Sequence, residues 1–251
     1  MTRVAIPKFA LAALSLLYAE PALAQDTSPI GQTTAVVRDV QGAINAKSTP
    51  LKIGDKLVFL EEISAGEASA AQMRFIDATE LSVGANSRVT LDAFVFTGSG
   101  SPPAMATQLV TGVLRFVTGQ MEKDAYNVRT GVAVVGVRGT VFDLIIAPDG
   151  ATIVYVEEGS IQFANLGGTA VTVTAGLASR IDAQSGPPSP PQPPAPGALA
   201  PVVAMTTTLA TAALPADVIP DATTERVAAL AAAAAKLADE TDSSSPGGGL
   251  K

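Results

Sequence analysis

The sequence predicts an all-β domain followed by a Pro-rich disordered spacer and an Ala-rich helix. Between residues 31 and 182, short apolar and β-branched runs alternate with a period of two. Gly, Asn-Ser or Asp-Gly separates most of these runs at intervals of about 8–12 residues. No stretch in this region repeats apolar residues at helical spacing. All nine aromatic residues after residue 24 lie between Phe59 and Phe163, so the predicted core belongs to this region.

Residues 1–24 are expected to be a secretory signal peptide. Arg3 and Lys8 give a basic start, and the following run from Phe9 to Tyr18 is apolar. This run is shorter than the ~20 apolar residues of a membrane span, so no stable span is expected after cleavage. We therefore expect a periplasmic or secreted protein. The residues expected to define the cleavage site are Ala22, Ala24 and Gln25.

Residues 25–182 are predicted to form one β-domain, which is long enough to bury a substantial core. Asp149-Gly150 lies between two strand-like runs and predicts a hairpin with a type I′ turn. At Ala78 we expect a type I turn, because alanine disfavours the left-handed backbone that glycine adopts easily. From pattern alone, a two-sheet β-sandwich fits this region.

The C-terminal part has a different composition. Residues 183–220 are predicted to be a linker, because eight of the sixteen residues from Gly186 to Pro201 are proline. Residues 221–240 are rich in alanine and predict a helix. Residues 241–251 are predicted to be a flexible tail.

Missing residue types exclude several function classes. The 251 residues include no His and no Cys, which excludes His-based triads, thiol nucleophiles and disulfides. The net charge is −7 without basic clusters, which argues against nucleic acid as a partner. No Lys stands in an SxxK arrangement and no glycine-rich loop leads into a helix. We therefore expect no enzyme, no cofactor and no metal site.

An ordered series of motifs in this region resembles the FecR-type domain, the extracytoplasmic part of transmembrane regulators of the ferric-citrate signalling type. The series includes VVRDVQGAI, LKIGDKL and QLVTGVLRFVTG, and it is densest at GVRGTVFDL, EGSI and TAG. The resemblance implies a solenoid-like stack of short strands that receives or relays an interaction in the cell envelope. Because the motifs follow an export signal directly, we expect a free-standing, exported version that lacks the cytoplasmic sigma-regulator and transmembrane parts.

Most motif residues are expected to have structural roles. Asp55 is expected to complete a turn rather than bind a cation. Arg138 either contacts a partner or, as we favour, pairs with a carboxylate such as Asp143 or Glu157. Glu157 and Glu158 are expected to point to opposite faces of one strand, which prevents them from acting together. The motif residues are Gly54, Asp55, Arg138, Gly139, Thr140, Phe142, Glu158, Gly159 and Gly176.

The primary hypothesis is a non-catalytic exported protein whose β-domain binds an envelope protein or a cell-wall glycan. Exposed strand edges would allow binding by strand addition. One alternative is a self-assembling structural or surface component. The other is a carbohydrate-active enzyme on a β-solenoid, which requires two carboxylates facing one groove. The oligomeric state is left open by the sequence.

Overall fold

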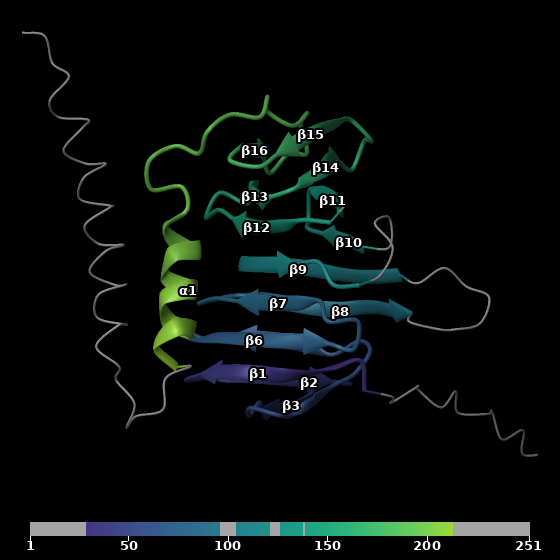
Figure 1. Ribbon diagram of the computed structural model, residues 1–251, viewed down its shortest axis with the longest axis vertical. Coiled ribbons are helices and arrows are strands. Elements are labelled where there is room, and N and C mark those ends of the chain that lie inside the picture. Colours follow the sequence, from purple (N-terminus) through teal and green to yellow (C-terminus); the bar gives the residue numbers. More distant parts are fainter. Residues whose placement is uncertain (1–28, 96–103, 121–125, 138, 213–251) are drawn as a thin grey trace, which may run out of the picture.

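The computed structural model describes residues 29–95, 104–120, 126–137 and 139–212. The expected cleavage site at Ala22, Ala24 and Gln25, the predicted helix over 221–240 and Arg138 lie outside the described residues. Short strands are stacked along the long axis of the molecule, with a helix beside them (Figure 1). The all-β, solenoid-like prediction is confirmed.

The strands form two sheets that share one long strand. In spatial order, sheet I contains β4 (Lys56–Leu57), β1 (Gly31–Val37), β6 (Ala70–Phe75), β7 (Glu80–Val83), β9 (Ala104–Val117), β12 (Val141–Ile146), β13 (Thr152–Glu158) and β16 (Ala178–Ile181). Sheet II contains β3 (Lys47–Pro50), β2 (Val40–Ile44), β5 (Glu62–Ala65), β8 (Arg88–Val95), β9, β10 (Tyr126–Arg129), β11 (Ala133–Val137), β14 (Ser160–Asn165) and β15 (Ala170–Thr174).

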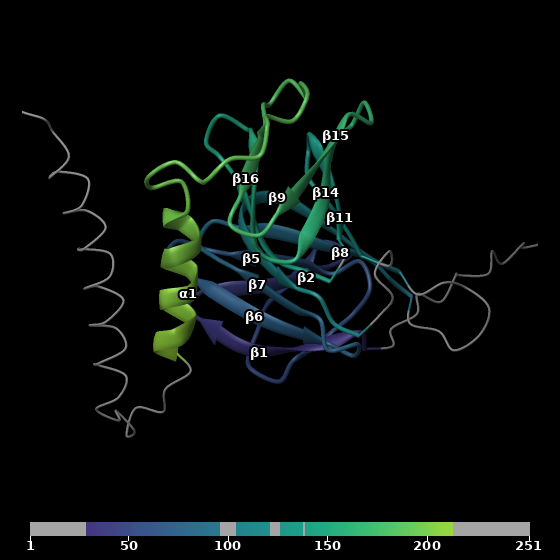
Figure 2. The ribbon, with the colours of Figure 1, turned by 45° about the horizontal axis from the view of Figure 1, so that its top comes forward.

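The two sheets face each other, so the molecule is also a two-layer structure. Figure 2 shows β16 in one layer and β11, β14 and β15 in the other. The alternating apolar side chains point between the layers. Among the described residues, Phe116, Phe142, Phe163 and Tyr126 are the largest aromatic side chains that are fully buried there. Phe116 stacks on Phe142 with ring centroids 5.4 Å apart. Period-two alternation therefore produces the core as predicted.

Strand β9 passes from one sheet to the other at Gly112. Its first part pairs with β8 and β10 in sheet II, and its last part pairs with β7 and β12 in sheet I. Gly112 has a φ of 90°, and a side chain there would meet the Cα atom of Ser87 at 2.5 Å. The Ser87 hydroxyl accepts a hydrogen bond from the Val113 N–H at 2.9 Å. Only glycine fits this crossing without strain.

The predicted hairpin joins β12 to β13, but its turn differs from the expected type. The N–H of Gly150 bonds the Ala147 carbonyl at 2.8 Å, and Gly150 has a φ of 82°. Pro148 lies between them and fixes its own φ near −65°. A type I′ turn needs positive φ at two successive residues, so proline favours a type I turn followed by a left-handed glycine. The backbone at Ala78 also differs from the prediction. Its φ is 67°, so alanine adopts the left-handed conformation that we expected it to avoid.

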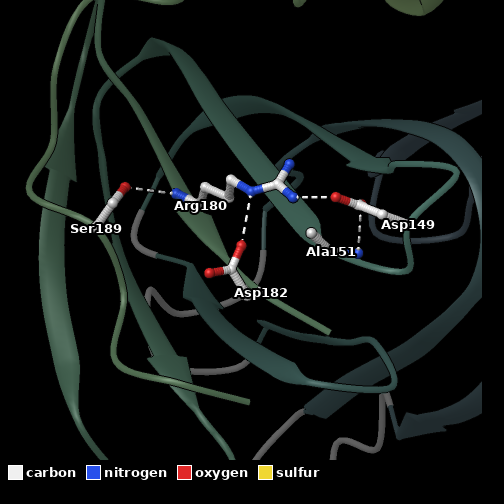
Figure 3. Close-up of polar contacts among 5 residues, drawn as sticks. All are labelled: Asp149, Ala151, Arg180, Asp182 and Ser189. Atoms are coloured by element: carbon white, nitrogen blue, oxygen red, sulfur yellow. Dashed lines mark hydrogen bonds and ion pairs between the residues drawn. The ribbon is translucent and has the colours of Figure 1, made fainter. Parts of the chain in front are cut away.

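The Pro-rich segment after β16 is extended, and it packs on the domain. Gln192 forms an isolated antiparallel bridge with Ala178 at the outer edge of β16. The N–H of Arg180 donates to the Ser189 hydroxyl at 3.0 Å, and the guanidinium contacts Asp149 and Asp182 (Figure 3). The segment predicted to be a disordered spacer therefore covers a strand edge.

The described helix, α1 (Ala200–Ala212), begins inside the segment predicted to be linker. Its position after the Pro-rich segment matches the predicted order of elements. Pro201 is compatible with a first helical turn, where its missing N–H is not needed. The hydroxyls of Thr206, Thr208 and Thr211 bond carbonyls one turn earlier, which satisfies these polar side chains. Within the described ranges, no helix has the length and apolar character needed to cross a membrane.

Helix α1 lies beside sheet I and packs against β1, β6, β9 and β12 (Figure 1). Val202 and Met205 bury their side chains against Val113 and Ile145 on the outer face of the sheet. Gly84 makes the close approach possible, since a Cβ atom there would lie 2.9 Å from the Met205 Cβ. Val113 and Ile145 are therefore buried by α1.

Candidate functional site

Four of the motif residues meet where the chain passes between the sheets in its C-terminal half. Thr140 links two neighbouring segments, because its N–H donates to Thr118 Oγ1 at 2.9 Å and its hydroxyl donates to the Ser160 carbonyl at 2.9 Å. A side chain on Gly159 would meet the Gly139 carbonyl at 2.5 Å. The N–H of Gly176 bonds the Val156 carbonyl at 2.8 Å. These residues lie at successive corners between strands, and the corners stack on one another in a column. Their polar groups form hydrogen bonds within this column.

Of the other described motif residues, Gly54 and Asp55 lie apart from that column, whereas Phe142 and Glu158 are its neighbours in the chain. The Asp55 carboxylate accepts a hydrogen bond from the Lys52 N–H at 2.8 Å, beside Gly54 at a φ of 88°. The Phe142 side chain lies in the core, and Glu158 is exposed on β13. The motif set therefore does not converge on one site.

The structure reveals a charged cluster on the outer face of sheet I. Arg115 of β9 is paired with Asp143 of β12 in the register, and its Nε lies 3.5 Å from Asp143 Oδ1. The other end of the guanidinium contacts Glu157 of β13. The Asp143 side chain is only 1% exposed, and its Oδ1 accepts no hydrogen bond from any described residue. Burial raises the pKa of Asp143 to about 6, and the charge of Arg115 offsets only part of this effect.

This cluster brings together two carboxylates, of which one has a raised pKa. Such a pair is the feature that a glycoside hydrolase needs, so it bears on the enzyme alternative. An acid catalyst must reach the leaving oxygen, however, and Asp143 is closed off from solvent. Arg115 is itself held between the two carboxylates. The geometry favours an internal ion cluster that holds β9, β12 and β13 together.

A second feature is a groove on the outer face of sheet II, with a volume of about 370 Å³. One row of the strand register crosses it from β10 to β15, through Asn127, Gly136, Gln162 and Thr172. Gly136 forms a low floor, because the nearest atom to a Cβ placed there would be the Gln162 Cβ at 3.8 Å. The Gln162 amide donates to the Thr172 hydroxyl at 2.8 Å. None of the residues that line the groove is charged.

The β10 end of the groove is fixed from below by a buried polar group. The Tyr126 hydroxyl donates to Asp77 Oδ2 at 2.8 Å, and the same carboxylate accepts bonds from the N–H and hydroxyl of Thr79. Asp77 lies in the β6–β7 turn, so this bond joins two segments far apart in the chain. The groove is therefore rigid at this end, and its amide and hydroxyl groups suit an uncharged polar ligand such as a peptide segment.

Sequence reasoning did not identify the members of either feature as a group. Arg115 interrupts an apolar strand run, and Gly136 interrupts VAVVGV. Both positions therefore stand out in the sequence as departures from the apolar pattern. Their partners come from strands that only the sheet order places side by side. In the described part of the chain, no three side chains suited to metal binding lie together.

Comparison with known proteins places these features in a family context. Residues 61–162 match the family described as FecR protein. No curated protein matches the chain. Two crystal structures, each of a candidate anti-sigma factor from Parabacteroides distasonis, are similar at 17% identity with TM-scores of 0.45 and 0.44. These matches cover 55% and 54% of this chain, and 62% and 61% of the solved chains.

Proposed function

Because residues 61–162 of this chain match the FecR protein family, we propose that the protein is an exported, non-catalytic binding protein with a signalling-related role in the cell envelope. The N-terminal segment, with its basic start and apolar run, supports export to the periplasm or beyond. The partner that we propose is another envelope protein.

The observation that carries this proposal is the uncharged groove across β10, β11, β14 and β15. Its lining presents amide and hydroxyl groups on strands that are hydrogen-bonded to their neighbours, so the groove keeps its shape. Preformed surfaces of this kind lose little entropy on binding. Neutral donors and acceptors match the backbone and polar side chains of a protein segment better than a charged ligand.

A capture experiment with a groove-filling variant tests the proposal. The full chain, treated with a crosslinker in an envelope extract, is expected to capture a specific protein. Gly136→Arg fills the groove without a backbone clash and is expected to abolish this capture. Ser48→Arg adds the same charge on the exposed strand β3, outside the groove, and is expected to preserve capture.

The outcomes separate the candidate partners. If the unmodified chain captures no protein but sediments with purified cell-wall glycan, the protein-partner proposal is wrong. If Gly136→Arg captures the same protein as the unmodified chain does, the partner binds elsewhere.

A further inference from the structure

The outer strands of the two sheets are protected to different degrees. Unpaired strand edges attract other strands, and proteins usually block them with lysine, proline, short length or a covering segment. In sheet I, β4 has two residues and β16 is bridged by Gln192. In sheet II, β3 carries Lys47 and Pro50. Strand β15 has five residues, none of them charged or proline, and no described segment pairs with its outer edge.

The hydrogen bonds at its two ends show which backbone groups of β15 face outward. The N–H of Asn165 bonds the Thr169 carbonyl at 3.0 Å, and the N–H of Ala175 bonds the Gly159 carbonyl at 3.1 Å. Because such bonds alternate along an antiparallel pair, the odd-numbered residues of β15 face β14. The N–H and C=O groups of Ala170, Thr172 and Thr174 therefore point away from the sheet.

The sequence of this edge is self-complementary. Val171-Thr172-Val173 reads the same in both directions, so an antiparallel copy centred on Thr172 places valine opposite valine and threonine opposite threonine. Both kinds of cross-strand pair are favourable, and no like charges meet. Val173 is already buried and Val171 is partly buried, so the pairing would also cover the part of Val171 that remains exposed.

We propose that β15 pairs with β15 of a second copy of this chain, around a two-fold axis at Thr172. Two-fold pairing uses the same surface on both molecules, as a self-complementary strand requires. Five residues of edge bury less surface than a permanent dimer needs, so the dimer is weak and depends on concentration. A strand from a different protein could use the same backbone groups, but it would not require the symmetric sequence.

The pairing would join the two grooves, a consequence that rests on the proposed function. Thr172 lines the groove at its β15 end, so the two-fold axis would place the two Thr172 side chains next to each other. Gly136 and Gln162 of each copy would then belong to one row across the combined sheet. The binding surface would be twice as long in the dimer as in the monomer.

Crosslinking through a single introduced thiol tests the pairing. The chain has no cysteine, so Thr172→Cys provides the only thiol. A short bis-maleimide is expected to crosslink the full-length variant into dimers, more completely at higher protein concentration. The matched control Thr49→Cys places an exposed thiol on the protected edge strand β3, away from the proposed contact, and is expected to give no crosslinked dimer.

Thr172→Pro provides a second, independent variant. Its lost N–H points away from β14, so the fold is retained, which circular dichroism can verify. Sedimentation is expected to show a concentration-dependent dimer for the unmodified chain and loss of that dimer for Thr172→Pro.

Two results would overturn the proposal. One is an unmodified chain that stays monomeric at all concentrations. The other is a Thr172→Cys variant whose thiol crosslinks only to other proteins in envelope extract. Dimers without any captured protein would instead leave the pairing intact and refute only the proposed function.

Discussion

Asp143 is a charged side chain at a position that the fold makes almost inaccessible to water. Ile145 on the same face of β12 is covered by α1, and Asp143 is enclosed by Arg115 and its neighbours. One ion pair at 3.5 Å does not compensate fully for the loss of hydration, which is why its pKa rises. The charged cluster of Arg115, Asp143 and Glu157 joins three strands of sheet I. The stability of this part of the sheet therefore depends on whether Asp143 is protonated.

The raised pKa of Asp143 predicts that the protein becomes more stable as the pH falls from 7 to 4. The carboxyl group has a pKa of about 6 in the folded state and 3.8 in the unfolded chain, so it binds its proton more tightly when the protein is folded. Its stabilising contribution is complete below pH 3.8 and is lost as the pH rises through 6, a difference of up to about 3 kcal/mol. Urea unfolding at several pH values would measure it.

Asp143→Asn is expected to remove this pH dependence and to raise the free energy of unfolding at pH 7. Glu67→Gln, which changes an exposed carboxylate, is the matched control and should leave the dependence in place. An unchanged pH profile in Asp143→Asn would show that another group is responsible.

At the level of elements, the strands and the position of a helix after the Pro-rich segment could be predicted, but the bounds of helix α1 could not. Period-two runs identify β-strands because each strand has one face in the core, and the GVRGTVFDL block marks a corner and the following strand. Helix α1 begins earlier than the predicted helix because it is stabilised by packing on Val113 and Ile145, which are distant in the sequence and therefore invisible to a local pattern. The groove was missed for the same reason, since sheet order alone brings Gly136 next to Gln162.

Gly84 is predicted to control the docking of α1. Gly84→Val places a side chain within 2.6 Å of the Val113 Cγ1 and 2.9 Å of the Met205 Cβ, so the helix must move outward. We expect a loss of about 1–3 kcal/mol in the free energy of unfolding, as is usual for overpacking. Limited proteolysis should cleave the variant near α1 faster than the unmodified chain.

Gly136→Val is the matched control, because a Cβ atom there would meet no atom closer than 3.8 Å. It should leave both the protease resistance of α1 and the stability unchanged or improved. Equal resistance in the two variants would mean that Gly84 does not set the helix position.

At the level of the whole molecule, the two sheets cannot be separated because both contain β9. Strands from the N-terminal half pair with one side of β9, and strands from the C-terminal half pair with the other. The crossing at Gly112 therefore lies at the centre of the strand network. A distortion there affects pairing in both sheets.

Gly112→Ala is expected to destabilise the whole domain much more than Gly54→Ala does. Both glycines have a φ near 90°, so both substitutions cost about 1–2 kcal/mol of backbone strain. Gly54 has open space around it, whereas an alanine at Gly112 also collides with Ser87. Thermal unfolding of the two variants measures the difference, and equal losses would contradict the importance of the crossing.

Helix α1 follows every described strand in the chain, yet it packs against β1, the first one. During synthesis, β1 is complete long before α1 is made, so the apolar face around Val113 and Ile145 stays uncovered until this helix is available. A chain that stops before Ala200 would retain all sixteen strands and expose this face to water and to other chains. Truncated products would therefore be prone to aggregation, and a chain that includes α1 would be protected by it.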